Sequence, residues 1–162
     1  MLLGHCASKV GLIRIFMVKG TSYYISTCLR IAESLPEWFG DEELKSMSSD
    51  LRGSDILVGV TERGNEVAGF LSFRSRFEDV IEVRWMGVRR DLMRKGIGTC
   101  LIKSLENLAQ RLGRKAIVIK TYCKPNSEAQ KITRKFLRTQ NYILIDTIES
   151  NKPINIYVKI IK

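Results

Sequence analysis

The chain has 162 residues and a net charge of +10, with 44% hydrophobic and 27% charged residues, which is the composition of an ordinary globular domain. No stretch approaches the roughly 18 consecutive apolar residues of a membrane helix, so a membrane protein is not expected. The cysteines lie far apart and form no CxxC pair, so the sequence predicts no metal site and four free thiols in a reducing cytoplasm. They are Cys6, Cys28, Cys100 and Cys123.

The first sixteen residues are mildly apolar, but Lys9 and Arg14 interrupt them and no basic region precedes them, so a signal peptide is not expected. Met17 offers an alternative start. Residues 1–16 are therefore interpreted as a leader or an extended start of one domain that covers 1–162. No internal repeat or Pro/Ser-rich linker divides the chain.

Apolar periodicity and turn residues predict the elements of the first half. In chain order they are a strand over 10–18, a helix over 21–35 that begins at Thr21 or Ser22, a helix from Asp41 to about Leu51, and strands over 56–61, 67–74 and 80–88. Gly64-Asn65 is the expected turn of a hairpin. The inward face of the first helix is expected to hold Ile25, Cys28, Leu29, Ala32 and Leu35.

The second half predicts alternating helices and strands. A helix is expected from Thr99 to Leu112, with Gly113 as its C-terminal cap. The other expected elements are a buried strand over 116–122, a helix over 127–139 capped by Ser127 with Ile132, Phe136 and Leu137 facing inward, and strands over 142–148 and 154–161. This order predicts a mixed α/β (α+β) domain with a largely antiparallel sheet.

The positive charge is concentrated in one segment. Residues 84–138 hold fifteen Lys or Arg and three acids, giving +12, whereas the remainder holds twelve basic and fourteen acidic residues, giving −2. Such clustering favours a phosphate-bearing partner. Nucleic acid is less favoured, because the segment has neither interleaved aromatic residues nor a recognised nucleic-acid-binding motif.

Within this segment, a strand that ends at Val88 is followed by Gly96-Ile97-Gly98 and a helix. The first amides of a helix have no internal partner and lie at the positive end of the helix dipole, so this turn predicts a diphosphate site. Two other phosphate loops are excluded, because Leu101 replaces the third glycine of a dinucleotide fingerprint and the pattern GxxxxGK[ST] is absent. The charged or polar neighbours are Arg94, Lys95, Thr99, and Arg89 or Arg90.

The stretch VRRDLMRKGIGTCLIKSLENLA resembles motif A of the GCN5-related N-acetyltransferase (GNAT) superfamily, whose pattern is a strand, then [QR]xxGx[GA], then a helix. Met93 departs from the [QR] position. The order of elements over 56–161 is also similar, which implies a sheet with helices on both faces and a splayed central strand pair. The resemblance implies acetyl-CoA as cosubstrate and no metal. The pyrophosphate would bind at Arg94, Lys95, Gly96, Ile97, Gly98 and Thr99, the pantetheine arm along Met86, Gly87 and Val88, and Asn126 resembles an asparagine near the cofactor.

Acetyl transfer to an amine needs a neutral nucleophile, a polarised carbonyl and protonation of the departing thiolate. The only histidine is His5, so no Cys-His pair is indicated and direct attack is preferred to a covalent intermediate. Glu82 is the candidate base, because it is a carboxylate in an otherwise apolar strand, and Glu78 is a weaker alternative. Glu82 could instead form an ion pair with Arg84 or Arg74 on a solvated sheet face.

The resemblance also implies a tyrosine acid in a helix-end motif similar to FYxxxGF, which corresponds to residues 136–142. Leu137 replaces that tyrosine, and Asn141 replaces the glycine, which Asn can do because it also adopts the left-handed conformation. Tyr122 or Tyr142 could act as the acid instead, or the thiolate leaves without help.

The acceptor side is expected in residues 21–52 and the closing strands. Aromatic residues there either line an acceptor pocket or pack in the core, and acidic residues there either suit a cationic amine or cap helices. These aromatic and acidic residues are Tyr23, Tyr24, Trp38 and Phe39, and Glu33, Glu37, Asp41, Glu42 and Glu43.

The sequence predicts a cytoplasmic N-acetyltransferase for a small amine or polyamine, or for a protein N-terminus or lysine. The alternatives are a non-catalytic CoA-binding module and an acetyltransferase for an RNA-linked amine, and a homodimer is an open alternative to a monomer.

Overall fold

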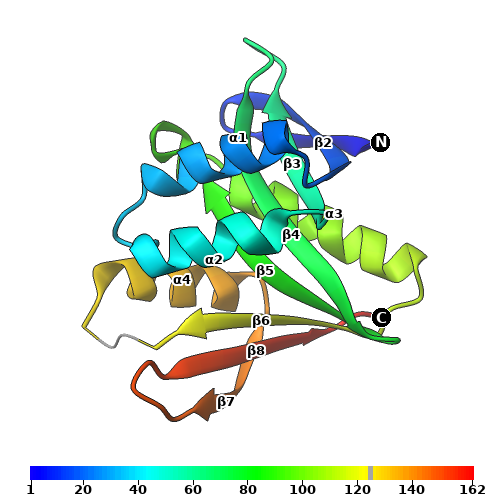
Figure 1. Cartoon of the computed structure of the whole chain (residues 1–162). Helices are drawn as coiled ribbons and strands as arrows, with labels where there is room; N and C mark the ends of the chain where they lie inside the picture. Colours follow the sequence, from blue (N-terminus) through cyan, green and yellow to red (C-terminus); the bar gives the residue numbers. More distant parts are fainter. Residues whose placement is uncertain (124–125) are drawn as a thin grey trace.

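The computed structural model describes residues 1–123 and 126–162, and within them eight strands form one sheet in the order β1-β2-β3-β4-β5-β6-β8-β7 (Figure 1). Among the described strands only β5 and β6 pair in parallel, which confirms the predicted largely antiparallel sheet. The elements are β1 (Leu2–Ser8), β2 (Gly11–Lys19), α1 (Ser22–Glu33), α2 (Asp41–Leu51), β3 (Asp55–Thr61), β4 (Val67–Phe77), β5 (Val80–Val88), η1 (Arg90–Leu92), α3 (Ile97–Arg111), β6 (Ala116–Tyr122), α4 (Glu128–Thr139), β7 (Ile143–Ile148) and β8 (Ile154–Ile160).

Helices cover both faces of the sheet, as predicted, and Figure 1 shows α1 and α2 in front of it with α3 behind. On one face Cys28 of α1 and Leu51 of α2 are fully buried in one apolar cluster with Phe70 of β4. On the other face Leu105 of α3 and Leu137 of α4 share a second cluster. Each helix therefore buries one apolar stripe, as amphipathic helices on a two-sided sheet do.

Several local sequence signals are confirmed. Gly64 and Asn65 have φ angles of 79° and 50°, as a tight hairpin turn requires. Gly113 (φ 70°) ends α3, and Asn141 (φ 65°) takes the left-handed conformation after α4. Ser127 caps α4, since its side chain accepts a hydrogen bond from the amide of Gln130 at 3.3 Å.

Other predictions are wrong in detail. No element is predicted for residues 2–8, yet they form β1, an edge strand whose residues are exposed or only partly buried and show little apolar alternation. Ile132 is 43% exposed rather than inward, and Ala129 takes the inward position. On α1, Ile31 is buried in place of Leu29.

The prediction of four free thiols is also wrong. Cys6 of β1 and Cys100 of α3 form a disulfide across a sequence separation of 94, and Cys28 and Cys123 are free. Sequence spacing does not reveal a bond of this kind, because the fold alone brings the two Cα atoms to 5.8 Å. None of the described helices is long and apolar enough to cross a membrane.

Candidate active site

The loop between β5 and α3 has the backbone of an anion-binding turn. Arg94 and Gly96 have φ angles of 60° and 95°, and α3 begins directly afterwards at Ile97. Within the described chain, no backbone carbonyl accepts a hydrogen bond from the amides of residues 94–99. These consecutive free amides lie at the positive end of the α3 dipole, which is the arrangement that binds phosphate groups.

Gly98 lies where α3, β5 and α4 meet. A Cβ at this position would lie 3.3 Å from Met86 Cε and 3.3 Å from Phe136 Cζ. On the next residue, Thr99 Oγ1 accepts a hydrogen bond from Gln140 Nε2 at 3.0 Å, which joins the end of α4 to the same turn. Because glycine has no Cβ, the backbone of the turn stays accessible between the side chains of Met86 and Phe136.

Two of the arginines expected beside the turn have structural partners instead. Arg89 forms ion pairs with Glu66 at 2.7 Å and with Asp91 at 2.8 Å. Arg90 pairs with Glu37 at 2.6 Å and also donates to the carbonyl of Ser34 at 2.9 Å. These contacts hold the loop against β4 and the end of α1. Among the described ion pairs none involves the other two cations, Arg94 and Lys95, which leaves both for a ligand.

The hairpin of β1 and β2 supports the turn from its other side. The amide of Lys9 donates to the carbonyl of Lys95 at 2.8 Å, and the Cys6–Cys100 disulfide joins β1 to the first turn of α3. Segments nearly one hundred residues apart thus hold one loop. The hairpin fixes the orientation of the free amides.

β5 and β6 separate beyond a short parallel ladder. They pair only over Val80–Val83 and Ala116–Ile119, and Figure 1 shows them diverging toward their carboxyl ends. Residues 86–88 of β5 stay paired with β4, but in the described sheet they have no partner on the side of β6. This is the splayed central pair that the sequence predicted. It leaves backbone donors and acceptors along Met86, Gly87 and Val88 that an extended ligand can reach.

The β4–β5 ladder contains two β-bulges, one next to the point of separation and one near the β4–β5 turn. The extra residue is Arg84 in β5 and Arg76 in β4, and a bulge redirects the side chains around it. Because of the bulge in β5, Arg84 and the following Trp85 reach the same partner on α2. Arg84 Nη2 lies 2.6 Å and Trp85 Nε1 3.0 Å from Asp50 Oδ2.

Both bulged arginines direct charge at Glu82, which is only 2% exposed. Arg84 Nη1 donates to Glu82 Oε1 at 3.0 Å. Arg74 Nη2 and Arg76 Nε lie 3.5 Å and 3.7 Å from Glu82 Oε2. The ion pairs considered as an alternative for Glu82 are therefore present, and Arg76 adds a third that the sequence did not indicate.

The pKa of Glu82 is lower than that of an ordinary glutamate. Burial raises the pKa, but the hydrogen bond from Arg84 and the charges of Lys120 and Arg74 together outweigh it. The carboxylate is therefore ionised at neutral pH and can accept a proton. A lowered pKa also makes it a weaker base than one tuned toward neutrality.

Tyr122 and Asn126 line one cavity of about 350 Å³ at the carboxyl end of β6. Its walls come from the end of β6, the start of α4 and the β7–β8 loop, including Lys152. Lys152 also forms an ion pair with Glu42 of α2. The structure thus brings together a tyrosine and an asparagine that the sequence singled out separately.

Tyr142 does not join this group. It lies before β7 rather than in it, its ring is 3% exposed in the core under α3, and its hydroxyl lies 3.4 Å from Glu106 Oε1. Burial and the nearby carboxylate raise its pKa far above the ordinary value. Leu137 is likewise a core residue, at 3% exposure. The tyrosine of the open cavity is therefore the better placed of the two candidates.

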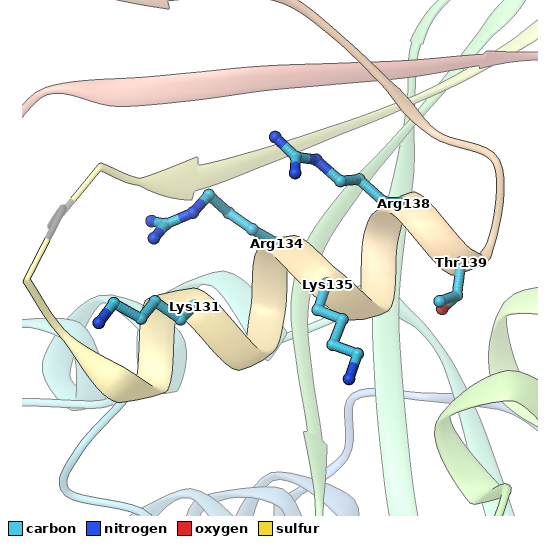
Figure 2. A pocket seen from close by; sticks show the side chains of 5 residues that line it. All are labelled: Lys131, Arg134, Lys135, Arg138 and Thr139. Atoms are coloured by element: carbon cyan, nitrogen blue, oxygen red, sulfur yellow. The ribbon is translucent and has the colours of Figure 1, made fainter.

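The outer surface of α4 carries a basic groove of about 540 Å³, lined by Lys131, Arg134, Lys135, Arg138 and Thr139. Figure 2 shows Arg134 and Arg138 extending from one side of the helix and Lys135 from the other. Part of the predicted charge cluster is therefore a continuous basic surface on one helix. Its four basic residues are among the fifteen counted in residues 84–138, but only the fold shows that they line one groove.

Three of the expected acceptor residues form structural contacts. Glu37 and Glu42 are used in ion pairs with Arg90 and Lys152. Trp38 Nε1 donates to the carbonyl of Ala129 at 3.1 Å and so joins the α1–α2 loop to α4. Two of the five expected acids are therefore used in structural contacts, whereas Glu33, Asp41 and Glu43 form no ion pair among the described residues.

Three comparisons place this geometry among known proteins. A model of the acetyltransferase (GNAT) family matches residues 25–137. A search of curated proteins finds no matching sequence. Among solved structures, a protein described as a GNAT-family acetyltransferase from Desulfovibrio desulfuricans aligns with a TM-score of 0.76 at 14% identity, over 91% of this chain and 99% of the other.

Two further structures have the same fold. An aminoglycoside 6'-N-acetyltransferase complexed with coenzyme A aligns with a TM-score of 0.69 at 15% identity, over 91% of this chain and 97% of that one. The ribosomal-protein-S18-alanine N-acetyltransferase from Escherichia coli aligns with a TM-score of 0.70 at 13% identity, over 91% and 94%. At these identities the similarity concerns the fold and not the acceptor.

Proposed function

The chain belongs to the GNAT family of acetyltransferases, and on that premise we propose that it moves an acetyl group from acetyl-CoA directly to a primary amine, without a covalent intermediate. The acceptor is a small amine, or the N-terminus or a lysine of a protein. The observation that carries the proposal is the run of free amides at 94–99, which leads directly to the unpaired edge of β5.

In this proposal the cosubstrate binds along one continuous path. Its pyrophosphate accepts hydrogen bonds from the amides of residues 94–99, with Arg94 and Lys95 adding charge. Its pantetheine arm pairs with the backbone of residues 86–88, and Asn126 lies beside the thioester end. The geometry supports this path, because Gly98 leaves the turn accessible and β6 has already separated from β5 at this point.

The chain's own groups then handle the protons. Glu82, acting directly or through a water molecule, accepts a proton from the attacking amine, and Tyr122 donates one to the departing thiolate. Acetyl-CoA supplies the activated thioester. The orientation of Glu82 comes from Arg84, which is itself held by Asp50.

Two assays test the proposal together. Isothermal titration calorimetry measures acetyl-CoA binding, and a thiol-release assay with a panel of primary amines measures transfer. Binding together with amine-dependent release of CoA supports the proposal. Absence of any CoA binding contradicts it.

Leu137 favours a second candidate, a non-catalytic CoA-binding module, because α4 presents a buried leucine where the resemblance implies a tyrosine acid. The basic groove on α4 favours a third, an acetyltransferase for an RNA-linked amine. CoA binding without release of CoA for any amine selects the second candidate. Transfer only to an aminoacylated RNA selects the third.

Replacement of Glu82 by glutamine is expected to lower kcat by roughly 100-fold or more, as the loss of a general base does. The affinity for acetyl-CoA, measured by calorimetry, should change little, because Glu82 lies away from the turn. Since its pKa is lowered, the wild-type carboxylate stays ionised through the neutral range, so the wild-type pH–rate profile should show no Glu82 limb between pH 6 and 9.

The same replacement has a signed effect on stability. The pKa of Glu82 is lower in the folded protein than in the unfolded chain, so its ionised form stabilises the fold at pH values above the ordinary glutamate pKa of about 4.3. This stabilisation is lost as the pH falls through the folded-state pKa. The difference in Tm between wild type and Glu82→Gln should therefore be constant at neutral pH and shrink below about pH 4. A kcat equal to that of wild type at every pH would remove Glu82 as the base.

Replacement of Tyr122 by phenylalanine is expected to lower kcat by roughly 10- to 100-fold, since the departing thiolate would lose its proton donor. Tyr142→Phe is the matched control, because its hydroxyl contacts Glu106 in the core, and it should retain wild-type kcat. Steady-state kinetics at saturating acetyl-CoA distinguish the two variants. The reverse pattern would assign the acid to Tyr142.

A cytoplasmic location is part of the proposal and bears on the Cys6–Cys100 disulfide, since cytosolic thiols are mostly kept reduced. Alkylation of thiols in intact cells, followed by peptide mass spectrometry, measures which redox form is present there.

A further inference from the structure

The face of the sheet under α1 and α2 carries more positive than negative charge around Glu82. On β4, Leu71 and Phe73 belong to the cluster under α3, so Arg74 lies on the opposite face. On β6, Ile117 and Ile119 belong to that same cluster, so Lys120 also lies opposite, next to the ladder position of Glu82. The charged groups on this face are Arg74, Arg76, Arg84 and Lys120 against Glu82 and Asp50, an excess of two positive charges (four minus two).

The arginines on this face differ in how fully they are used. Arg84 donates through both terminal nitrogens, to Glu82 at 3.0 Å and to Asp50 at 2.6 Å. Arg74 and Arg76 only approach one oxygen of Glu82, at 3.5 Å and 3.7 Å, and their side chains are 44% and 49% exposed. A guanidinium has five N–H donors, so both keep most of them for a ligand.

Ser72 supplies a second, independent observation. Its Oγ is buried at 1% exposure and has no hydrogen-bond partner among the described residues. It lies on the same face as Arg74, between that arginine and the separating end of β5, where it pairs with Trp85 in the ladder. Buried hydroxyls are rarely left without a partner, so a polar ligand group is expected near it.

We propose that the acceptor amine carries an anionic group, a carboxylate or a phosphate, which binds Arg74 and Arg76 while its amine lies between Glu82 and the thioester. This inference rests on the proposed acetyl transfer and names the class of its acceptor. A cationic polyamine would instead add charge to a face that is already positive. Two of the five acids expected to attract such an amine, Glu37 and Glu42, are used in ion pairs with Arg90 and Lys152 instead.

The anionic group also has a consequence for Glu82. In the free protein three arginines and Lys120 act on one buried carboxylate. A bound anion competes for Arg74 and Arg76, so fewer cations oppose protonation of Glu82 when the acceptor is in place. The bound acceptor thus makes Glu82 a stronger base for the proton that the acceptor amine gives up.

A matched acceptor series tests the inference at saturating acetyl-CoA. It comprises an ω-amino acid, the ω-aminoalkyl phosphate, the primary amide of the amino acid, and the diamine, all of one chain length. We expect kcat/KM to be at least 10-fold higher for the carboxylate or the phosphate than for the amide and the diamine. The ratio between the first two shows which anion the site prefers.

Variants of Arg74 and Arg76 test whether these residues cause the preference for an anionic acceptor. Arg74→Gln combined with Arg76→Gln should lower the anion-to-amide ratio of kcat/KM by at least 10-fold, mainly by raising KM for the anion. The corresponding lysine variants should restore part of the ratio. Arg63→Gln is the matched control, because Arg63 lies exposed in the β3–β4 turn. It removes one arginine charge, half of what the double variant removes, and should leave the ratio unchanged.

The outcomes separate the two proposals. A diamine or amide that is acetylated as well as the anions overturns the inference and leaves the acetyltransferase in place. Preferred transfer to an aminoacylated RNA over every small anionic amine overturns it as well. CoA binding without transfer to any acceptor overturns the proposed function first, and the inference with it.

Discussion

Gly98→Glu is expected to abolish measurable binding of acetyl-CoA while leaving the protein folded. The new carboxylate would stand in the first turn of α3, where the free amides of 94–99 are proposed to hold the pyrophosphate. Two unit charges about 4 Å apart near a protein surface repel by about 4 kcal/mol, which corresponds to a loss of several hundred-fold in affinity. The crowding by Met86 and Phe136 adds to this effect.

The fold itself should tolerate the change. A glutamate in the first turn of a helix interacts favourably with the dipole, and glycine is a poor residue inside a helix. These gains offset the crowding of the new side chain by Met86 and Phe136, so the Tm of the ligand-free variant should stay close to that of wild type, and weak binding is then not attributable to unfolding.

Two controls complete the measurement of CoA affinity by calorimetry. Asn107→Glu adds the same charge on an exposed position of α3, more than two turns away, and should bind acetyl-CoA as wild type does. Gly98→Ala adds the Cβ without the charge and should lose only part of the affinity. Retained affinity in Gly98→Glu would contradict the assignment of the turn.

Most of the fold could be predicted because its signals are local. The glycine turn, the Ser127 cap and the tight turn at Gly64-Asn65 each depend on neighbours within a few residues. The splayed strand pair was predicted from a resemblance carried by residues 88–109. In the turns and the cap the backbone conformation follows from residues that are close in sequence.

The parts that could not be predicted depend on distant residues. The Cys6–Cys100 bond and the support of Lys95 by Lys9 join the two ends of a long segment. The bulge at Arg76 changes which face its side chain reaches, and no sequence periodicity records an inserted residue. Glu82 was singled out as the candidate base, but its setting among three arginines appears only once β4 and β5 are paired.

These distant contacts give the two halves of the site different character. The proposed cofactor half is backbone, held by the β1–β2 hairpin and by α4. The proposed acceptor half is side chains on β4, β5 and β6, with charges that no local motif specifies. Members of one fold family can therefore keep the first half while the second changes with the acceptor.

Reduction of the Cys6–Cys100 disulfide is expected to lower both stability and affinity for acetyl-CoA. A cross-link that closes a loop of roughly 100 residues stabilises a fold by up to about 4.7 kcal/mol in the chain-entropy model, and measured values are often smaller. The bond here spans 94 residues. A loss of about 3 kcal/mol would lower Tm by roughly 6–12 °C for a chain of this size.

The effect on affinity follows from where the bond lies. Cys100 is in the first turn of α3, and β1 leads directly to Lys9, whose amide holds the carbonyl of Lys95. Without the bond, β1 can separate from α3, so the amides of 94–99 lose part of their fixed orientation. Since preorganised donors bind more tightly than mobile ones, we expect a loss of roughly 3- to 10-fold in CoA affinity.

Differential scanning calorimetry with and without dithiothreitol measures the first effect, and titration with acetyl-CoA under the same conditions measures the second. Cys6→Ala should resemble the reduced wild type and no longer respond to dithiothreitol, whereas Cys123→Ala removes a free thiol and should keep the full response. A Tm that dithiothreitol leaves unchanged, in protein shown by peptide mapping to contain the bond, would mean that β1 is held by its other contacts alone. In that case the ladder with β2 and the Lys9–Lys95 hydrogen bond suffice to fix the turn, and its affinity for CoA is independent of the redox state.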